Sequence, residues 1–128
     1  TWGGGGTGGA LPDLAAAARL HVGDVAAFVA GADPGTFDAV YSVETLQHVP
    51  AGTGAFDGLA RVAGDLLVTV ENEDGVADGD VNFVDDGVPL YYRDWGAVFG
   101  DRGLVETVEE PHGRDHLRAF RPADAAER

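Results

Sequence analysis

The chain has 128 residues, a formal net charge of −14 and 45% apolar residues, an apolar share that is normal for a globular domain. This length predicts one domain with a sizeable core. The absence of cysteine excludes disulfides, thiolate metal sites and a cysteine nucleophile. No apolar run approaches the roughly 18 residues of a membrane span. The acidic balance argues against nucleic acid as a partner, because its phosphates need cations. Without a signal-peptide or transit-peptide pattern, we expect a cytoplasmic location.

The charge carries a second expectation. All eight basic side chains are arginines, against 22 carboxylates. Such a charge repels itself in dilute buffer, and molar salt screens the repulsion because the Debye length falls to roughly 3 Å at 1 M. We therefore expect a halophilic protein. The alternative is an ordinary acidic protein from a GC-rich genome.

The first third of the chain predicts short elements after an irregular start. Residues 1–9 are mostly glycine and predict a flexible segment. The Ala-rich residues 11–20 predict a helix. Residues 21–24 predict a short strand that stops at a Gly-Asp turn, and residues 25–30 predict a short helix or turn. The sequence Asp-Pro-Gly at 33–35 is typical of a turn.

The middle of the chain carries the clearest strands. Residues 37–43 (FDAVYSV) are rich in strand formers, and residues 46–50 predict a loop. Thr53 is suited to cap a helix whose apolar face holds Phe56, Leu59, Ala60 and Ala63. The apolar run 65–70 (DLLVTV) predicts a strand covered on both faces.

The last third begins with an acidic segment. Residues 71–87 hold seven carboxylates and predict an exposed loop. Residues 92–100 predict a helix with Trp95, Val98 and Phe99 on one face, stopped by Gly103. Residues 104–109 and 116–120 predict an antiparallel hairpin, and a charged tail from Pro122 predicts frayed chain.

This order of elements predicts the fold class. Strands that alternate with helices favour an α/β domain with a Rossmann-like, mostly parallel sheet, and the closing hairpin adds an antiparallel strand. We divide the chain into an irregular start (1–9), an α/β core (10–122) and a frayed tail (123–128), all within a single partial domain.

Several segments resemble one family in the order that the family has them. FDAVYSVETLQHVP resembles the fourth-strand segment of class I S-adenosylmethionine-dependent methyltransferases of the small-molecule type. LHVGD resembles the third strand of the family, and LARVAGDLLVTVENE its next helix and fifth strand. YYRDWGAVFGDRGLVE and LRAFRP resemble the late helix and the closing strands. The resemblance covers roughly residues 13 to 122, and with the acidic composition it suggests a haloarchaeal member.

The resemblance implies a cofactor site at the carboxyl ends of the strands, where ligands of open parallel sheets bind. It implies that Asp24 accepts a hydrogen bond from the adenine amino group and that the amide of Val25 faces the ring. Ser42, Val43 and Glu44 would border the sulfonium and the substrate entrance. The alternatives are that Asp24 is only a turn residue and that Glu44 is only solvated.

Other residues are candidates for acting on the methyl acceptor. His48 suits a general base, although a loop histidine satisfied by backbone is an equal alternative. We give Glu44 and His48 as catalytic candidates. Tyr91, Tyr92 and Arg93 are candidates for shaping a substrate lid, against the alternative that they belong to the core.

The glycine run at the start matches the G-x-G-x-G loop of the family at Gly4, Gly6 and Gly8. The family has an apolar strand before this loop, and a further strand, with a ribose-binding acid, before LHVGD. Residues 10–20 are too few for that strand and its helices. We therefore expect a domain that lacks the first two strands of the full fold, through truncation or internal deletion. Residues 37–43 would then have a bare edge, and cofactor would bind weakly or not at all.

We therefore predict S-adenosylmethionine-dependent methyl transfer to an unidentified small molecule, impaired by the missing cofactor-binding elements. The alternatives are a non-catalytic remnant or interaction module, and a fragment of another Rossmann-like nucleotide-binding domain. No metal site is expected. Residues 78–82 begin like a calcium loop but have Phe83 where glycine is required, and His112 and His116 have a helical spacing in a strand context.

Overall fold

The computed structural model describes residues 18–19, 21–73, 81–84 and 87–126. Its helices are α2 (Val25–Ala30), the 3-10 helix η1 (Leu46–His48), α3 (Ala55–Val62), α4 (Trp95–Gly100) and α5 (Ala123–Ala126). Its strands are β1 (Phe37–Val43), β2 (Ala63–Asn72), β3 (Val81–Val84), β4 (Val88–Tyr91), β5 (Leu104–His112) and β6 (Asp115–Pro122). Within this part of the chain, no helix has the length and apolar character needed to cross a membrane.

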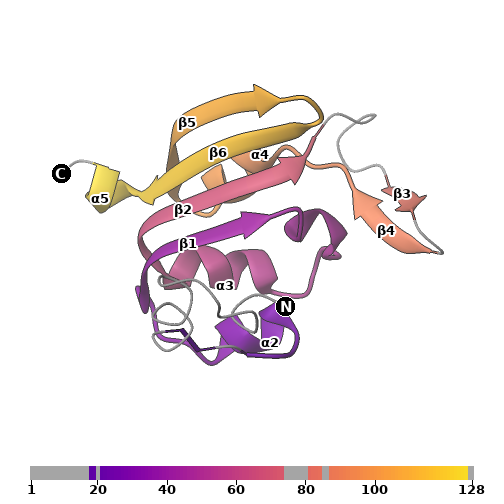
Figure 1. Cartoon of the computed structure of the whole chain (residues 1–128). Coiled ribbons are helices and arrows are strands. Elements are labelled where there is room, and N and C mark those ends of the chain that lie inside the picture. Colours follow the sequence, from indigo (N-terminus) through magenta and orange to yellow (C-terminus); the bar gives the residue numbers. More distant parts are fainter. Residues whose placement is uncertain (1–17, 20, 74–80, 85–86, 127–128) are drawn as a thin grey trace, which may run out of the picture.

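Four strands form the main sheet, in the order β1-β2-β6-β5. β1 and β2 run parallel, with Val40 beside Leu67 and Ser42 beside Thr69. β6 runs antiparallel to both β2 and β5. Figure 1 shows the four strands side by side, with the β3–β4 hairpin beyond the arrowheads of β1 and β2. The predicted α/β fold with a C-terminal antiparallel hairpin is confirmed, and the described sheet is mixed, with one parallel pair.

The core lies on one face of this sheet. Leu67 of β2 and Phe120 of β6 are cross-strand neighbours with 0% exposure, and they point toward the helices. An aromatic cluster continues from them: Phe99 lies 5.4 Å from Phe120, and Trp95 lies 5.2 Å from Phe56 between ring centroids. Each buried side chain of this size contributes roughly 1.5–3 kcal/mol. This cluster therefore ties α3, α4 and the hairpin β5–β6 into one unit.

The second face of β2 corrects the sequence prediction. Leu66, Val68 and Val70 are only half-buried, whereas Leu67 and Thr69 are fully buried. The run 65–70 was expected to be covered on both faces, because a continuous apolar stretch is typical of such strands. In the described part of the chain, the residues of β2 instead alternate between a covered and a partly open face.

The helix starts show why the local sequence folds as it does. Asp24 caps α2 through its side chain, which accepts from the amide of Ala26, and Asp94 caps α4 in the same way. Thr53 does not occupy the cap position of α3, because Gly54 does so with φ of +85°. Its hydroxyl still accepts from the amide of Ala55 at 3.3 Å. Gly103, with φ of +86°, ends the α4 region as predicted.

Three boundaries in the second half differ from the prediction. Residues 71–87 are not all loop: Glu71 and Asn72 end β2, and Val81–Val84 form β3, paired with β4. Helix α4 begins at Trp95 rather than at residue 92, because Tyr91 still belongs to β4. The tail after Pro122 forms the short helix α5, with Ala125 buried against the hairpin. Tertiary contacts, which local composition does not report, decide these boundaries.

The first third differs most. Residues 21–24 were predicted to form a strand, but they pair with no strand in the described part of the chain, and the side chain of Val22 is fully exposed. Within the predicted helix 11–20, Ala18 and Arg19 have no regular secondary structure, and the other residues lie outside the described ranges. A segment forms a strand only where a neighbouring strand can pair with it. Among the described residues β1 pairs only with β2, so residues 21–24 do not pair with β1. The bare edge expected for residues 37–43 is therefore observed there, with Tyr41 79% exposed.

Candidate functional site

The parallel pair β1 and β2 brings two carboxyl ends to the same edge of the sheet. A small hollow of about 310 Å³ opens beside β1, lined by residues of α2, β1, the segment after it and α3. Three predicted cofactor residues, Val25, Ser42 and Val43, line this hollow together. The topology thus unites residues that are 17 or more positions apart in the sequence, as the strand-end argument requires.

Asp24 and Val25 form the start of α2. One carboxylate oxygen of Asp24 accepts from the amide of Ala26 at 2.9 Å. Its other oxygen, and the amide of Val25, have no partner among the described residues. Both residues also line a larger hollow of about 1010 Å³, whose wall includes Phe28 and Phe37. An acceptor and a donor therefore stand beside an aromatic wall.

Glu71 organises the opposite part of this region. Its side chain is fully buried at the end of β2. One oxygen accepts from the amides of Thr45 at 2.9 Å and Gln47 at 3.0 Å, and the other accepts from the hydroxyl of Ser42 at 2.8 Å. Burial raises the pKa of Glu71, and these hydrogen bonds oppose the rise. No cation pairs with this carboxylate among the described residues.

His48 lies half-buried at the end of η1, between two elements. Its Nδ1 lies 2.7 Å from the carbonyl oxygen of Pro89 in β4. Because a carbonyl only accepts, Nδ1 carries the proton in the neutral ring, and Nε2 keeps a lone pair. Nε2 lies 3.4 Å from the side-chain nitrogen of Gln47. The hairpin β3–β4 therefore orients the ring in the tautomer that a general base at Nε2 requires.

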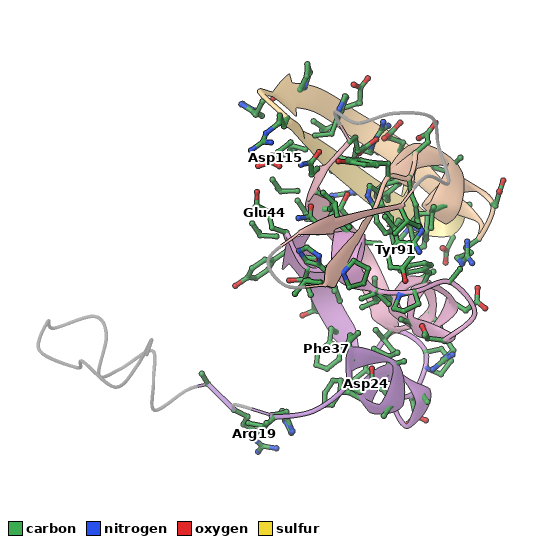
Figure 2. All side chains as sticks on the ribbon, turned by 90° about the vertical axis from the view of Figure 1, so that its right-hand side faces the viewer. Arg19, Asp24, Phe37, Glu44, Tyr91 and Asp115 are labelled. Atoms are coloured by element: carbon green, nitrogen blue, oxygen red, sulfur yellow. The ribbon has the colours of Figure 1, made fainter. Side chains whose placement is uncertain are left out.

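Glu44 lies on the far side of this segment, at the end of β1. Figure 2 shows Glu44 close to Asp115 and well separated from Asp24. A hydrogen bond with the carboxyl group of Asp115, and the charge of that group, raise the pKa of Glu44. Glu44 also has φ of +48°, and its amide donates to the carbonyl of Val70 at 2.7 Å. The structure therefore sets Glu44 beside an acidic neighbour from β6.

The lid candidates occupy the end of β4 and the residues after it. The guanidinium of Arg93 lies over three aromatic rings, 4.6 Å from the centroid of Tyr91, 5.0 Å from Phe56 and 5.5 Å from Trp95. It also donates to the carbonyl of Leu46 at 3.4 Å. These contacts give Arg93 a packing role that links the core to η1. Tyr91 and Tyr92 are half-buried, and a substrate role for all three stays a prediction.

The predicted and the observed site residues differ in part. The predicted Gly4, Gly6 and Gly8 lie outside the described residues. Four groups at the site were not predicted from the sequence: Glu71, Gln47, Asp115 and the carbonyl of Pro89. A signal for Glu71 did exist, because it continues the period-two series of Leu67 and Thr69 on the buried face of the strand. Gln47 lies in the short helix η1 and Asp115 is the first residue of β6, and no such pattern marks either of them.

No protein-family model matches the chain, and no curated protein matches it. Solved structures do match. The PH0226 protein of Pyrococcus horikoshii has a TM-score of 0.59 at 13% identity, over 88% of this chain and 65% of that one. A complex of Haloferax volcanii, between the Trm112 methyltransferase activator and a protein described as a methyltransferase, gives 0.55 at 12% identity, over 84% and 65%. An S-adenosylmethionine-dependent methyltransferase of Mesorhizobium loti gives 0.56 at 13% identity, over 89% and 76%.

These likenesses concern the fold. The chain spans about two thirds of the length of the first two structures, and identities of 12–13% carry no residue roles. The fold found here nevertheless superposes on most of an S-adenosylmethionine-dependent methyltransferase, with a TM-score of 0.56. The chain therefore has a partial Rossmann-like α/β fold, similar to that of the Mesorhizobium loti methyltransferase.

Proposed function

We propose that this chain is part of an S-adenosylmethionine-dependent methyltransferase that acts on a small molecule, and that the chain by itself binds the cofactor weakly. One observation carries the proposal. The hollow at the carboxyl end of β1 gathers Val25, Ser42 and Val43 in a fold shared with a methyltransferase that uses this cofactor. The carboxyl ends of parallel strands are the usual ligand site of such sheets.

The described residues fit the purine end of the cofactor. The unpartnered oxygen of Asp24 suits an exocyclic amine, and the amide of Val25 suits a ring nitrogen. The aromatic wall of Phe28 and Phe37 beside them suits a flat ring. We assign the methionine end to the loop of Gly4, Gly6 and Gly8, on the family resemblance alone. When bound, the cofactor supplies a methyl group on a cationic sulfur, for attack by a nucleophile of the acceptor.

The roles of the protein side chains follow from their positions. We assign removal of the acceptor proton to Nε2 of His48, because the Pro89 carbonyl keeps the ring proton on Nδ1. Glu44 borders the same segment, and its carboxylate favours a cationic neighbour. We assign the hairpin β3–β4, with Tyr91, Tyr92 and Arg93, to the substrate side. We assign recognition of the methyl acceptor to these residues.

Calorimetric titration with S-adenosylmethionine in molar KCl tests the proposal, because salt screens the charge of −14 that opposes folding. We expect saturable binding that is weaker than micromolar and is reduced by Asp24→Ala. Cofactor at ten times Kd stabilises the fold by about 1.4 kcal/mol, which thermal unfolding detects. No binding at millimolar cofactor would refute the assignment. Micromolar binding with methyl transfer would refute the impairment.

A second candidate is an interaction module without catalysis. The bare edge of β1 favours it, because unpaired strand edges are templates for pairing with another chain. The Haloferax volcanii structure, in which the fold occurs in a complex with an activator, also supports a protein partner. Cofactor separates the two candidates: a methyltransferase melts at a higher temperature with S-adenosylmethionine, and an interaction module does not.

A further inference from the structure

Glu71 is an unusual residue for its position. It is a carboxylate with 0% exposure, and it has no cationic partner among the described residues. An isolated buried charge is costly unless hydrogen bonds compensate for its lost hydration. A buried carboxylate at such a position indicates that its hydrogen bonds have a role that an apolar side chain could not fill. Its partners therefore indicate its role.

All three hydrogen-bond partners of the Glu71 side chain belong to one segment, residues 42–47, which covers the end of β1 and the residues after it. Two are backbone amides, those of Thr45 and Gln47, and the third is the hydroxyl of Ser42. The amide of Glu44 still donates to the carbonyl of Val70 in β2, whereas the amides of Thr45 and Gln47 donate to the carboxylate of Glu71. Glu71 therefore supplies the acceptor for two amides that lie beyond the end of the β1–β2 ladder.

The same contacts reach His48 through Gln47. The side-chain oxygen of Gln47 accepts from the amide of Asn72 at 2.6 Å, so this side chain is held against the end of β2. Its nitrogen faces Nε2 of His48 at 3.4 Å, and Pro89 holds the other ring nitrogen. Glu71 thus fixes the backbone of this segment. Gln47 contacts Nε2 of the His48 ring, and Pro89 contacts Nδ1.

We propose that Glu71 is a positioning residue, which holds residues 42–48 in place and thereby sets the orientation and tautomer of the His48 ring. Its catalytic meaning rests on the proposed function, but the positioning itself does not. The length of the side chain is the operative property. The carboxylate oxygens must reach from β2 to the amides of Thr45 and Gln47. A glutamine side chain has the same length: its oxygen can accept from both amides, and its nitrogen can donate to the hydroxyl of Ser42.

Two variants of Glu71 separate length from charge in the protein without cofactor. Glu71→Gln keeps the length and removes the charge, whereas Glu71→Asp keeps the charge and withdraws the oxygens by one methylene. Thr69→Val is the matched control, since Thr69 lies two residues earlier on the same buried face and its hydroxyl has no partner among the described residues. The readouts are amide hydrogen exchange at Thr45 and Gln47, and the ring nitrogen shifts of His48.

We expect Glu71→Asp to speed exchange at Thr45 and Gln47 by about tenfold or more, the effect of losing a buried hydrogen bond. It should also mix the tautomers of His48. Glu71→Gln should stay within about threefold of the wild type and keep the Nδ1–H tautomer. Thr69→Val should not speed exchange at either amide and should leave the tautomer unchanged. The proposal is overturned if Glu71→Asp leaves exchange and tautomer unchanged, or if Glu71→Gln disturbs them as much. Failed cofactor binding by the wild type would bear on the proposed function alone.

Discussion

The contact between α2 and α3 depends on the absence of a side chain at Gly58. A Cβ added there would lie 2.2 Å from Cγ2 of Val29 and 2.9 Å from its Cβ. Val29 is 2% exposed, and the Cβ of a β-branched residue cannot move away by a change of rotamer. Overpacking costs about 1–3 kcal/mol, and an overlap at 2.2 Å belongs to the upper part of that range, about 2–3 kcal/mol. The better helix propensity of alanine returns about 1 kcal/mol. We therefore expect Gly58→Ala to destabilise the fold by about 1–2 kcal/mol.

Urea unfolding in molar KCl measures this loss as a lower midpoint with an unchanged slope. Gly100→Ala is the matched control, because it is also a helical glycine and has nothing within 4 Å of the added Cβ. It should be neutral or mildly stabilising. In a Val29→Ala background, Gly58→Ala should lose most of its cost, because Cγ2 at 2.2 Å is gone and only the Cβ at 2.9 Å remains. A Gly58→Ala protein as stable as the wild type would refute the close approach of the two helices.

Three further predictions concern buried polar groups. Thr69→Val should raise the free energy of unfolding by about 1 kcal/mol in urea, because the buried hydroxyl has no partner among the described residues; a loss of stability would contradict this. Arg118→Ala should lower the free energy of unfolding by about 3–5 kcal/mol in the same assay. In the wild type the guanidinium lies 2.9 Å from the buried carboxylate of Glu73, and the substitution leaves that carboxylate without its cation. Arg121→Ala is the control, since its pair with Asp65 at 3.9 Å is exposed and should matter little. For Glu71, burial raises the pKa in the folded state above the ordinary 4.5, so the folded state holds this proton to higher pH than the unfolded state does. Its contribution to stability is therefore lost as pH rises from about 4.5 through the raised pKa, and the stability of the wild type relative to Glu71→Gln should fall over that range; a rise would refute the sign.

The candidate site depends on how well this part of the chain holds together. The aromatic cluster of α3, α4 and β6 is large, with Phe56, Trp95, Phe99 and Phe120 buried. The residues of the edge strand β1 are mostly exposed to solvent, and this strand carries the predicted residues Ser42 and Val43. Glu71 connects the two regions, because it belongs to the central strand β2 and bonds the segment after β1. The geometry of the site therefore depends on the hydrogen bonds of Glu71, which link the buried strand β2 to the exposed strand β1 and the residues after it.

The sequence by itself determined the elements whose signals are local. Strand β1 has the predicted bounds, since FDAVYSV is rich in strand formers and the charged Glu44 follows it. Helix α4 buries Trp95 and Phe99 as their spacing predicted, and Gly103 takes the positive φ that ends the helix. The closing hairpin follows from two strand-forming runs joined at Gly113, although β5 extends through Pro111 to His112. Each of these results depends on residues that are near one another in the chain.

Tertiary structure decided what depends on distant partners. Residues 21–24 have the composition of a strand but pair with none among the described residues, because pairing needs a neighbour at the right place. Residues 81–84 lie in an acidic segment, yet they form β3 because β4 is there to pair with them. The site shows the same division. His48 was visible as a residue type, but only the fold brings Pro89, Gln47 and the buried Glu71 to it, from positions up to 41 residues away.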